Sequence, residues 1–257
     1  MRLAHTLEAP AAPDQARSAN LEVRTKFEFR ISNFLQASSF GLRVLTAVLI
    51  FVLPAIAHAY PKPSEFPVSW ELKFKHGTPK RIAVKAPGSD LPKAYWYMTF
   101  SITNPTDQEQ QFLPEFELLT REGEVIRSDK NIPAEVFDAI KSRERNKGLE
   151  PLSKIAGRIL VGEDQTRDGV AIWPEPANPR MGTFSIFVGG LSGETCYMKD
   201  GQELDKDKIN WHDMSPEDKK ALVVLHKQLQ LTFQIPGDEF YPGEDAVLDK
   251  GKEWVMR

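Results

Sequence analysis

The sequence has very little cysteine and histidine, which limits the chemistry open to it. Cys196 is its only cysteine, and five histidines are spread along 257 residues. A single thiol excludes an intrachain disulfide, so the fold must be held by its apolar core. The last three histidines, His76, His212 and His226, lack the close spacing of zinc ligands. We therefore expect no zinc site, and we interpret Cys196 as a partly buried apolar residue.

An excess of positive charge is also missing. The formal net charge is −3. Residues 1–59 contain six basic and four acidic residues, so 27 basic and 32 acidic residues remain after them and the net charge becomes −5. Nucleic acids and anionic membrane surfaces both attract basic faces. We therefore predict no nucleic acid partner, and no general attraction to an anionic lipid surface.

Long apolar runs are absent except for one, at residues 44–57. A basic residue precedes it, a proline interrupts it, and it leads into the small-x-small pattern Ala57-His58-Ala59. These features are typical of a secretory signal peptide. We therefore predict that residues 40–59 are a signal peptide cleaved after Ala59, which makes the mature chain periplasmic or extracellular. No cysteine lies near this position, which excludes a lipoprotein anchor.

A retained membrane anchor is the alternative interpretation of the same run. A helix needs about 20 apolar residues to cross a bilayer, and the run has only 14. If residues 42–59 stay uncleaved, the membrane is contacted through them and the protein is a membrane-tethered accessory subunit. Residues 1–39 precede a segment that usually begins a chain. We interpret them as a disordered extension, or as the product of a misassigned translation start.

From residue 69 onward, short stretches alternate between apolar and polar residues. The clearest are Ser69–Lys75, Tyr95–Thr103 and Gln228–Ile235, and turn residues separate them. A period of two predicts half-buried strands. The preceding residues 60–68 contain three prolines, which indicates an extended linker.

Two short helices are expected among these strands. Pro133 begins one that ends near Asn146, and Ser215-Pro216 is a strong start for the other. Strands and helices do not alternate regularly, so a doubly wound sheet is excluded. We therefore predict a mainly β fold over residues 69–257, an antiparallel immunoglobulin-like sandwich with one or two short inserted helices.

One acidic segment partly matches a calcium-binding loop. Asp164, Asp168 and Glu175 stand at positions 1, 5 and 12 of the EF-hand pattern, with glycine at position 6. A threonine at position 3 and an arginine at position 4 depart from it, and the expected strand Arg158–Val161 stands where a helix should precede it. Calcium is the only cofactor that the sequence suggests, and a polar hairpin turn is the alternative.

Aromatic residues supply the candidate ligand-binding positions. Of five tryptophans, Trp173 and Trp211 lie at a strand end and in a loop, where we expect exposure. Tyr95 and Tyr97 stand on the more polar face of their strand and would extend a binding surface. These four residues predict a surface for an envelope protein or a glycan, since aromatic side chains form carbohydrate platforms.

A catalytic constellation is missing. The stretch around Ser192 lacks the second spacer of a nucleophile elbow. The remaining enzyme hypothesis is a carbohydrate-active or other hydrolase that uses the acidic residues Asp164, Asp168, Asp238 and Glu239. The sequence favours a non-enzymatic function over this one.

Two segments in the middle of the chain each combine a strand with a turn. Tyr97–Asn104 is a strand that runs into an Asn-Pro turn, and Thr166–Trp173 is a polar turn followed by Gly-Val-Ala-Ile-Trp. In these segments the chain resembles exported bacterial immunoglobulin-like domains of uncharacterised function. The resemblance implies that fold and an exported setting, and it carries over no catalytic residue. A binding or structural module of the cell envelope is therefore the expected function.

Overall fold

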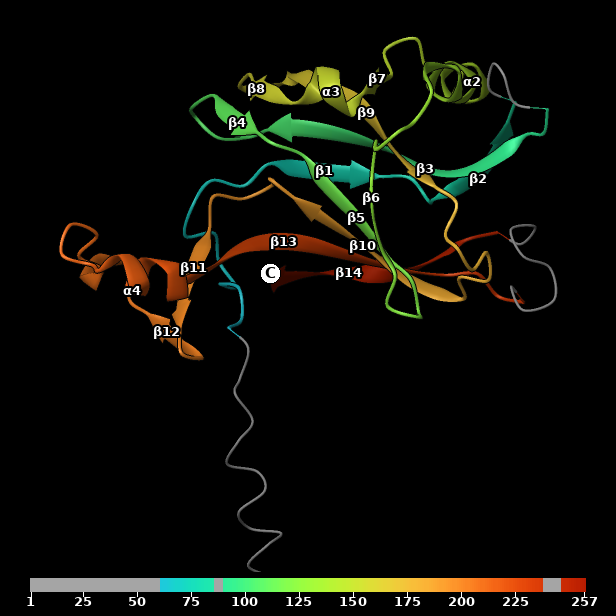
Figure 1. Cartoon of the computed structure of the whole chain (residues 1–257). Coiled ribbons are helices and arrows are strands. Elements are labelled where there is room, and N and C mark those ends of the chain that lie inside the picture. Colours follow the sequence, from blue (N-terminus) through green and yellow to red (C-terminus); the bar gives the residue numbers. More distant parts are fainter. Residues whose placement is uncertain (1–60, 86–89, 238–245) are drawn as a thin grey trace, which may run out of the picture. The chain divides into compact units, whose positions relative to one another are not determined.

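The computed structural model describes residues 61–85, 90–237 and 246–257 (Figure 1). These residues form a mainly β structure with antiparallel sheets, as the alternating sequence predicts. The predicted signal peptide with its cleavage residues Ala57 and Ala59, and the extension 1–39, lie outside the described residues.

The first sheet is built around strand β3 (Lys93–Asn104). One edge of β3 pairs antiparallel with β9 (Gly162–Pro174), and the other pairs with β1 (Lys73–His76) and β2 (Lys80–Val84). The two-residue strand β7 (Glu150–Pro151) extends the sheet beyond β9 and is parallel to it.

The second sheet is built around strand β13 (Val223–Gln234). One edge of β13 pairs first with β11 (Thr195–Lys199) and then with β10 (Thr183–Gly189), and all three are antiparallel to their neighbours. The opposite edge pairs with β14 (Leu248–Met256). The connecting loop, residues 190–194, therefore lies along the edge of β13 between β10 and β11.

Shorter elements complete these sheets and connect them. The second sheet continues from β10 to β5 (Glu115–Leu119) and β6 (Val125–Arg127), and from β11 to β12 (Gln202–Leu204). A separate pair joins β4 (Gln110–Phe112) and β8 (Gly157–Ile159). The helices are α2 (Ala134–Glu144), α3 (Leu152–Ile155), α4 (Pro216–Ala221) and the 3-10 turn η2 (Lys206–Lys208). In the described ranges, none of the helices has the length and apolar character needed to cross a bilayer.

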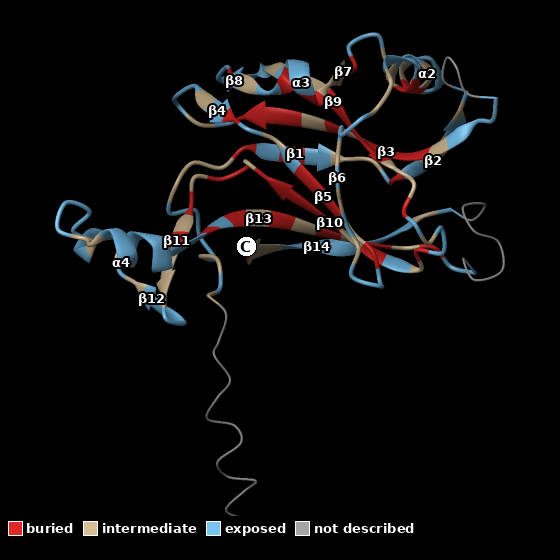
Figure 2. Cartoon of the chain, viewed as in Figure 1, coloured by how far each residue is buried: buried red, intermediate tan, exposed pale blue. Residues whose placement is uncertain are grey.

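The two sheets face each other across one aromatic core, which Figure 2 shows as buried stretches on the facing strands. The Phe100 ring of β3 lies 5.0 Å from the Phe116 ring of β5, and Trp96 lies 6.2 Å from Phe184. The apolar stripe of β3 opposite Tyr95 and Tyr97, which includes Met98 and Ile102, is buried. Alternating apolar residues on both layers therefore meet as expected for packed sheets.

The outer face of the first sheet is buried as well. Helix α2 packs Val136 and Ile140 against Tyr95, Tyr97 and their neighbours on β9. The helix begins and ends close to the predicted positions, and the serine expected to cap α4, Ser215, accepts a hydrogen bond from the Asp218 amide at 3.1 Å. Strand β3 is therefore covered on both faces.

Cys196 lies in a small satellite core with Leu225 and Met256, which confirms its interpretation as a buried apolar residue. Its Sγ lies 3.8 Å from Sδ of Met198. Burial, followed by the nearby Glu203 carboxylate, raises the pKa of the Cys196 thiol to about 11. The thiolate is the reactive form, so this position is chemically protected.

We predict that Cys196 reacts slowly with a disulfide reagent such as DTNB in the native protein. At pH 8 a pKa raised from 9.0 to about 11 lowers the thiolate fraction about 100-fold relative to the unfolded chain. Stopped-flow absorbance with and without 6 M urea, conditions chosen to unfold the chain, measures the ratio. Equal rates in the two conditions would show that the thiol is exposed.

Candidate functional site

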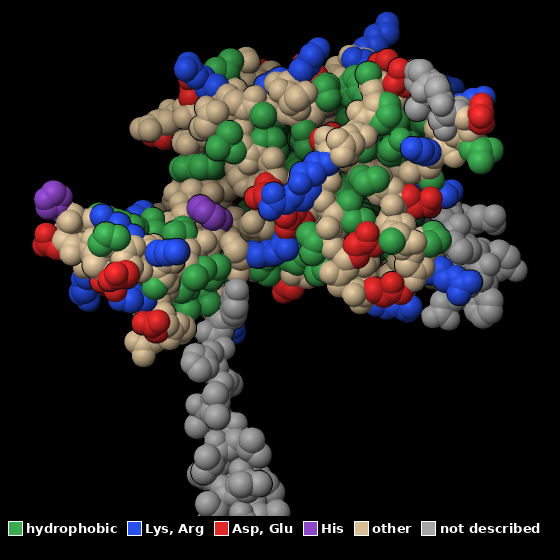
Figure 3. Space-filling view, viewed as in Figure 1, with side chains coloured by type: hydrophobic (Ala, Val, Ile, Leu, Met, Phe, Trp, Pro, Cys, Tyr) green, Lys and Arg blue, Asp and Glu red, His purple; other side chains and the backbone are tan. Residues whose placement is uncertain are grey.

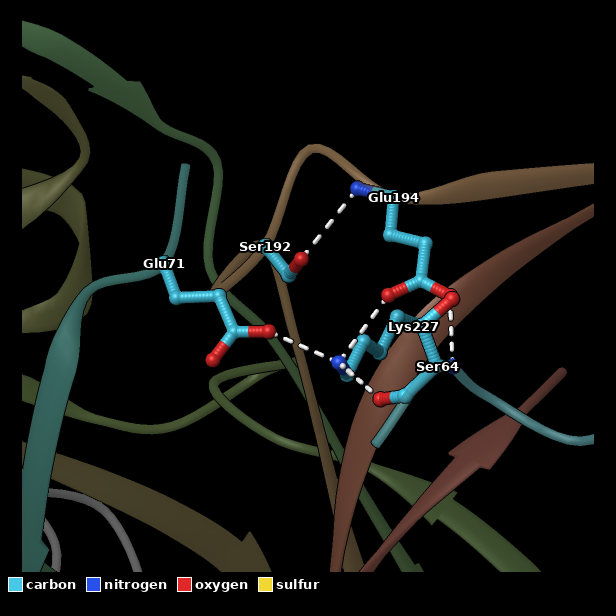
Figure 4. Close-up of polar contacts among 5 residues, drawn as sticks. All are labelled: Ser64, Glu71, Ser192, Glu194 and Lys227. Carbon is cyan, nitrogen blue, oxygen red and sulfur yellow. Dashed lines mark hydrogen bonds and ion pairs between the residues drawn. The ribbon is translucent and has the colours of Figure 1, made fainter. Parts of the chain in front are cut away.

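The strongest polar cluster of the described chain surrounds a buried lysine, Lys227 (Figure 4). Its side chain is only 2% exposed, although it stands on the long strand β13. The ammonium donates to Oε1 of Glu71 at 2.7 Å and to Oε2 of Glu194 at 2.9 Å. Its third hydrogen bond reaches the carbonyl oxygen of Ser64 at 3.2 Å. All three protons of the ammonium therefore have acceptors.

The cluster joins the N-terminal segment to the second sheet. The Ser64 amide donates to Oε1 of Glu194 at 2.8 Å, so the Glu194 carboxylate holds both Ser64 and Lys227. Glu194 belongs to the loop between β10 and β11, and its carbonyl accepts from the Lys227 amide. We call Ser64, Glu71, Glu194 and Lys227 the clasp.

Backbone contacts beside the clasp fix the same segment a second time. The Leu72 amide donates to the Leu191 carbonyl at 2.8 Å, and the Gly193 amide donates to the Trp70 carbonyl at 3.1 Å. A Cβ at Gly193 would collide with the Trp70 ring, so glycine permits this close approach. The segment 64–72 is therefore held at both of its ends.

Electrostatics in the clasp favour the ion pair. Burial disfavours the charged form of Lys227, but the hydrogen bonds and charges of Glu71 and Glu194 outweigh it and raise the pKa of the ammonium. Burial also acts against ionised Glu194, and the bonds from Ser64 and Lys227 outweigh it and lower the pKa of that carboxyl. A lysine with a raised pKa is a poor general base, so the clasp is structural rather than catalytic.

A second feature is an arm formed by residues 195–222, which Figure 1 shows extending beyond the two layers. Tyr197 and Val224 are paired across β11 and β13, so their side chains share one face. The Trp211 ring packs edge-on against Tyr197 at 5.3 Å and is 46% exposed. Figure 3 shows hydrophobic and charged side chains interspersed over this arm.

The arm also contains a hollow of about 510 Å³. Leu204, Ile209 and Met214 give it apolar walls, and lysine, aspartate, glutamate and asparagine side chains surround them. Asn210 donates to Asp213 at 2.6 Å and accepts from the His212 amide, which fixes the loop that carries Trp211. Apolar walls with a few polar groups are the usual lining of a ligand site.

A smaller hollow of about 280 Å³ lies on the first sheet, beside the end of α2. Ser101 and Asn146 donate to the two oxygens of Asp168, at 2.7 and 2.9 Å. His76 lines the hollow too, but its Nδ1 lies 3.1 Å from the Gly77 carbonyl rather than beside Ser101. The serine proton is directed at a carboxylate and not at an imidazole, so this arrangement lacks the relay of a catalytic triad.

Three of the four predicted ligand-binding aromatics are inside the fold. Tyr97 and Trp173 have no exposed surface and Tyr95 is 5% exposed, so the expectation that they form a binding surface is wrong. Helix α2 covers the face that carries the tyrosines, and Trp173 turns into the main core. Burial, followed by the hydrogen bond to Glu144, raises the pKa of Tyr97 far above its usual range. Trp211 is the one that remains available.

The predicted calcium ligands lie on or just beyond one extended strand instead of a loop. Asp164 and Asp168 belong to β9, which ends at Pro174, and Glu175 follows it. At about 3.3 Å per residue, Asp164 and Glu175 are tens of ångströms apart along the strand. Glu175 pairs with Arg81, and no group of three acidic, histidine or cysteine side chains in the described ranges could hold a metal ion. The calcium interpretation of this segment is therefore wrong.

The proposed hydrolase residues are not assembled by the part of the chain that the structure describes. Asp168 lines the smaller hollow and Asp164 does not. Asp238 and Glu239 lie outside the described residues. No family model, no curated relative and no solved structure matches this chain. The candidate site must therefore be judged on its geometry alone.

The sequence contains a signal for the clasp that strand prediction overlooks. The predicted strand begins at Gln228, but β13 begins at Val223. In the longer strand Leu225, Lys227 and Leu229 share the inward phase, and all three are buried. A lysine in the inward phase of an alternating strand predicts a buried charge with acceptors nearby.

We predict that Lys227→Met destabilises the protein by about 3–5 kcal/mol, because it leaves the Glu194 carboxylate buried without its cation. Lys73→Met is the matched control. It removes an ion pair with Glu163 whose partners are 45% and 77% exposed, and such surface pairs contribute about 1 kcal/mol or less. Urea unfolding followed by tryptophan fluorescence measures both. Similar losses for the two variants would contradict a buried clasp.

The clasp also predicts loss of stability in acid. Because the pKa of Glu194 is lowered from 4.5 in the folded state, its contribution is fully present above that value and is lost as the pH falls through the folded pKa. Wild type should therefore exceed Glu194→Gln in unfolding free energy at pH 7, and the gap should close below pH 4.5. Urea titrations from pH 7 to pH 3 test this, and a gap that widens in acid would refute it.

Proposed function

We propose that the protein is an exported, non-enzymatic binding module of the cell envelope. The exposed Trp211 is the observation that carries this proposal: it packs against Tyr197 in the loop whose residues Asn210 and Asp213 line the larger hollow. The export role rests on the signal-like segment 40–59, and the product is periplasmic or extracellular, or anchored if that segment is retained. The immunoglobulin-like form of the fold is part of the same proposal, supported by two sheets packed around one aromatic core.

An envelope glycan is the ligand class that the arm fits best. Sugar rings stack their apolar faces on aromatic side chains and use their hydroxyl groups for hydrogen bonds. Trp211 provides the ring, and Asn210, Asp213 and Lys208 are polar groups that stand close to it along the chain and line the hollow. The polar groups are already paired in part, as between Asn210 and Asp213, which gives the loop a fixed shape before any ligand arrives.

The hydrolase alternative receives less support. A pair of catalytic carboxylates must face each other across a cleft at about 5–10 Å. Asp168 is held by Ser101 and Asn146, and Asp164 accepts from Gln165 on the exposed part of β9. These two acids are thus engaged in separate local contacts.

We predict that Trp211→Ala weakens binding to insoluble glycans roughly tenfold, the value of about 1.4 kcal/mol of lost stacking. The probes are purified peptidoglycan sacculi and chitin, with bound protein measured by sedimentation. His212→Ala, an exposed neighbour in the same loop, is the control and should bind as wild type does.

Two results would contradict this proposal. Equal binding by wild type and Trp211→Ala would remove the tryptophan from the site. Binding of wild type to an envelope protein but to neither glycan would replace the glycan with a protein partner.

A further inference from the structure

The N-terminal segment exposes two large apolar side chains on a loop that is fixed at both ends. Phe66 is 79% exposed and Val68 is 68% exposed, and Phe66 has the highest exposure among the large apolar residues that the structure describes. The clasp holds Ser64 on one side, and the backbone bonds of Trp70 and Leu72 hold the other. We call residues 65–69 the tip.

The tip cannot easily fold its apolar residues inward. Only five residues separate the anchored Ser64 from Trp70, and Pro67 at their centre has a fixed backbone φ angle. Solvent contact with the phenylalanine and valine side chains is unfavourable. Large apolar side chains that are held outward on a short constrained loop are typical of a contact site for another molecule or for a membrane.

The chain segment that precedes the tip indicates which partner the tip contacts. The apolar run 44–57 ends seven residues before Ser64. An extended chain spans at most about 3.3–3.6 Å per residue, so Phe66 stays within about 30–32 Å and Val68 within about 36–40 Å of that end. If the run lies in a lipid bilayer, the tip is therefore kept near the membrane surface.

Length and charge agree with a lipid surface. The run of 14 residues is shorter than the roughly 20 that span a bilayer, so it benefits from a second apolar contact. Lys62, just before the tip, and Glu65 within it are both exposed and have opposite charges, so the surface around the tip is near neutral. With a net charge of −5 in residues 60–257, this suits zwitterionic headgroups better than anionic ones.

We propose that Phe66 and Val68 insert into the interface of a phospholipid bilayer in which residues 44–57 remain. The domain is then held against the membrane by two weak apolar contacts, one in the leader and one on the folded surface. The clasp is what gives the tip its fixed direction. This inference rests on the export role proposed above for residues 40–59.

The test uses the full chain reconstituted in phosphatidylcholine vesicles. Val68→Cys, labelled with an environment-sensitive NBD group, reports on the tip while Phe66 remains in place. The control is Leu248→Cys with the same label, because Leu248 is 46% exposed and pairs with Gln234, at the opposite end of β13 from the clasp residue Lys227. Cys196 is buried and is replaced by alanine in both.

We expect the label at residue 68 to shift to shorter emission wavelengths and to be quenched by spin-labelled lipid, with neither effect at residue 248. The double variant Phe66→Ser/Val68→Ser, read at an added Leu248→Cys label, should retain the wild-type unfolding midpoint. A fragment of residues 60–257 lacks the apolar run and so isolates the contribution of the tip. With both serine substitutions, this fragment should partition into vesicles at least tenfold more weakly than the same fragment with the native tip.

Four outcomes would overturn the proposal. The first is aqueous emission at residue 68 in vesicles. The second is a shift that occurs without lipid and grows with protein concentration, which would make a second copy of the chain the occupant. The third is equal partitioning of the native and serine-substituted tips. The fourth is a mature chain processed after Ala59, because that chain has lost residues 44–57. Export is read separately, from protease digestion of the domain outside intact cells, so a failure at the tip is distinguishable from a failure of the export proposal.

Discussion

A buried ammonium group organises the junction between the N-terminal segment and the second sheet. Lys227 stands in the inward phase of β13, where its charge is stable only if acceptors surround it. Those acceptors come from two separate places: Glu194 from the loop between β10 and β11, and the Glu71 carboxylate and Ser64 carbonyl from the segment before β1. The interruption between β10 and β11 leaves room for Glu194 beside β13. The interrupted strand pairing and the buried charge of Lys227 therefore depend on each other.

The second constraint is that β3 is buried on both faces. Its alternating residues make two apolar stripes, one for the core between the sheets and one for helix α2. The hydroxyl group of Tyr97 donates to Glu144 on α2 at 2.6 Å, and Lys80 donates to the same carboxylate. Aromatic residues with polar atoms can thus occupy an interior position when the covering helix provides the partner. Among the described residues, Trp96 and Trp173 are buried in the main core without such a partner for their indole N–H groups.

Local patterns predicted the elements well and their partners poorly. The alternation of β3 and β13 and the proline and serine helix starts determine type and approximate bounds from nearby residues alone. The helix that covers the outer face of β3 is about thirty or more residues away along the chain. Nothing in the local sequence therefore indicates that Tyr95 and Tyr97 are buried. Likewise, the carboxylates that match a calcium loop lie along β9, because strand pairing with β3 overrides the loop pattern. The clasp joins residues up to 163 positions apart and no local pattern contains it.

The distribution of polar and apolar groups is what supports the proposed binding role. In a catalytic centre, ionisable groups face a cleft with free hydrogen-bonding capacity and perturbed pKa values that allow proton transfer. Here the buried Lys227 and Glu194 satisfy each other, and their pKa shifts favour the charged states that they already have. Three large aromatic or β-branched side chains are exposed as well: Phe66 and Val68 on the tip and Trp211 on the arm. A buried charge pair and exposed large apolar side chains both depart from the usual distribution of residues, and the exposed ones are the groups that the proposed binding role would use.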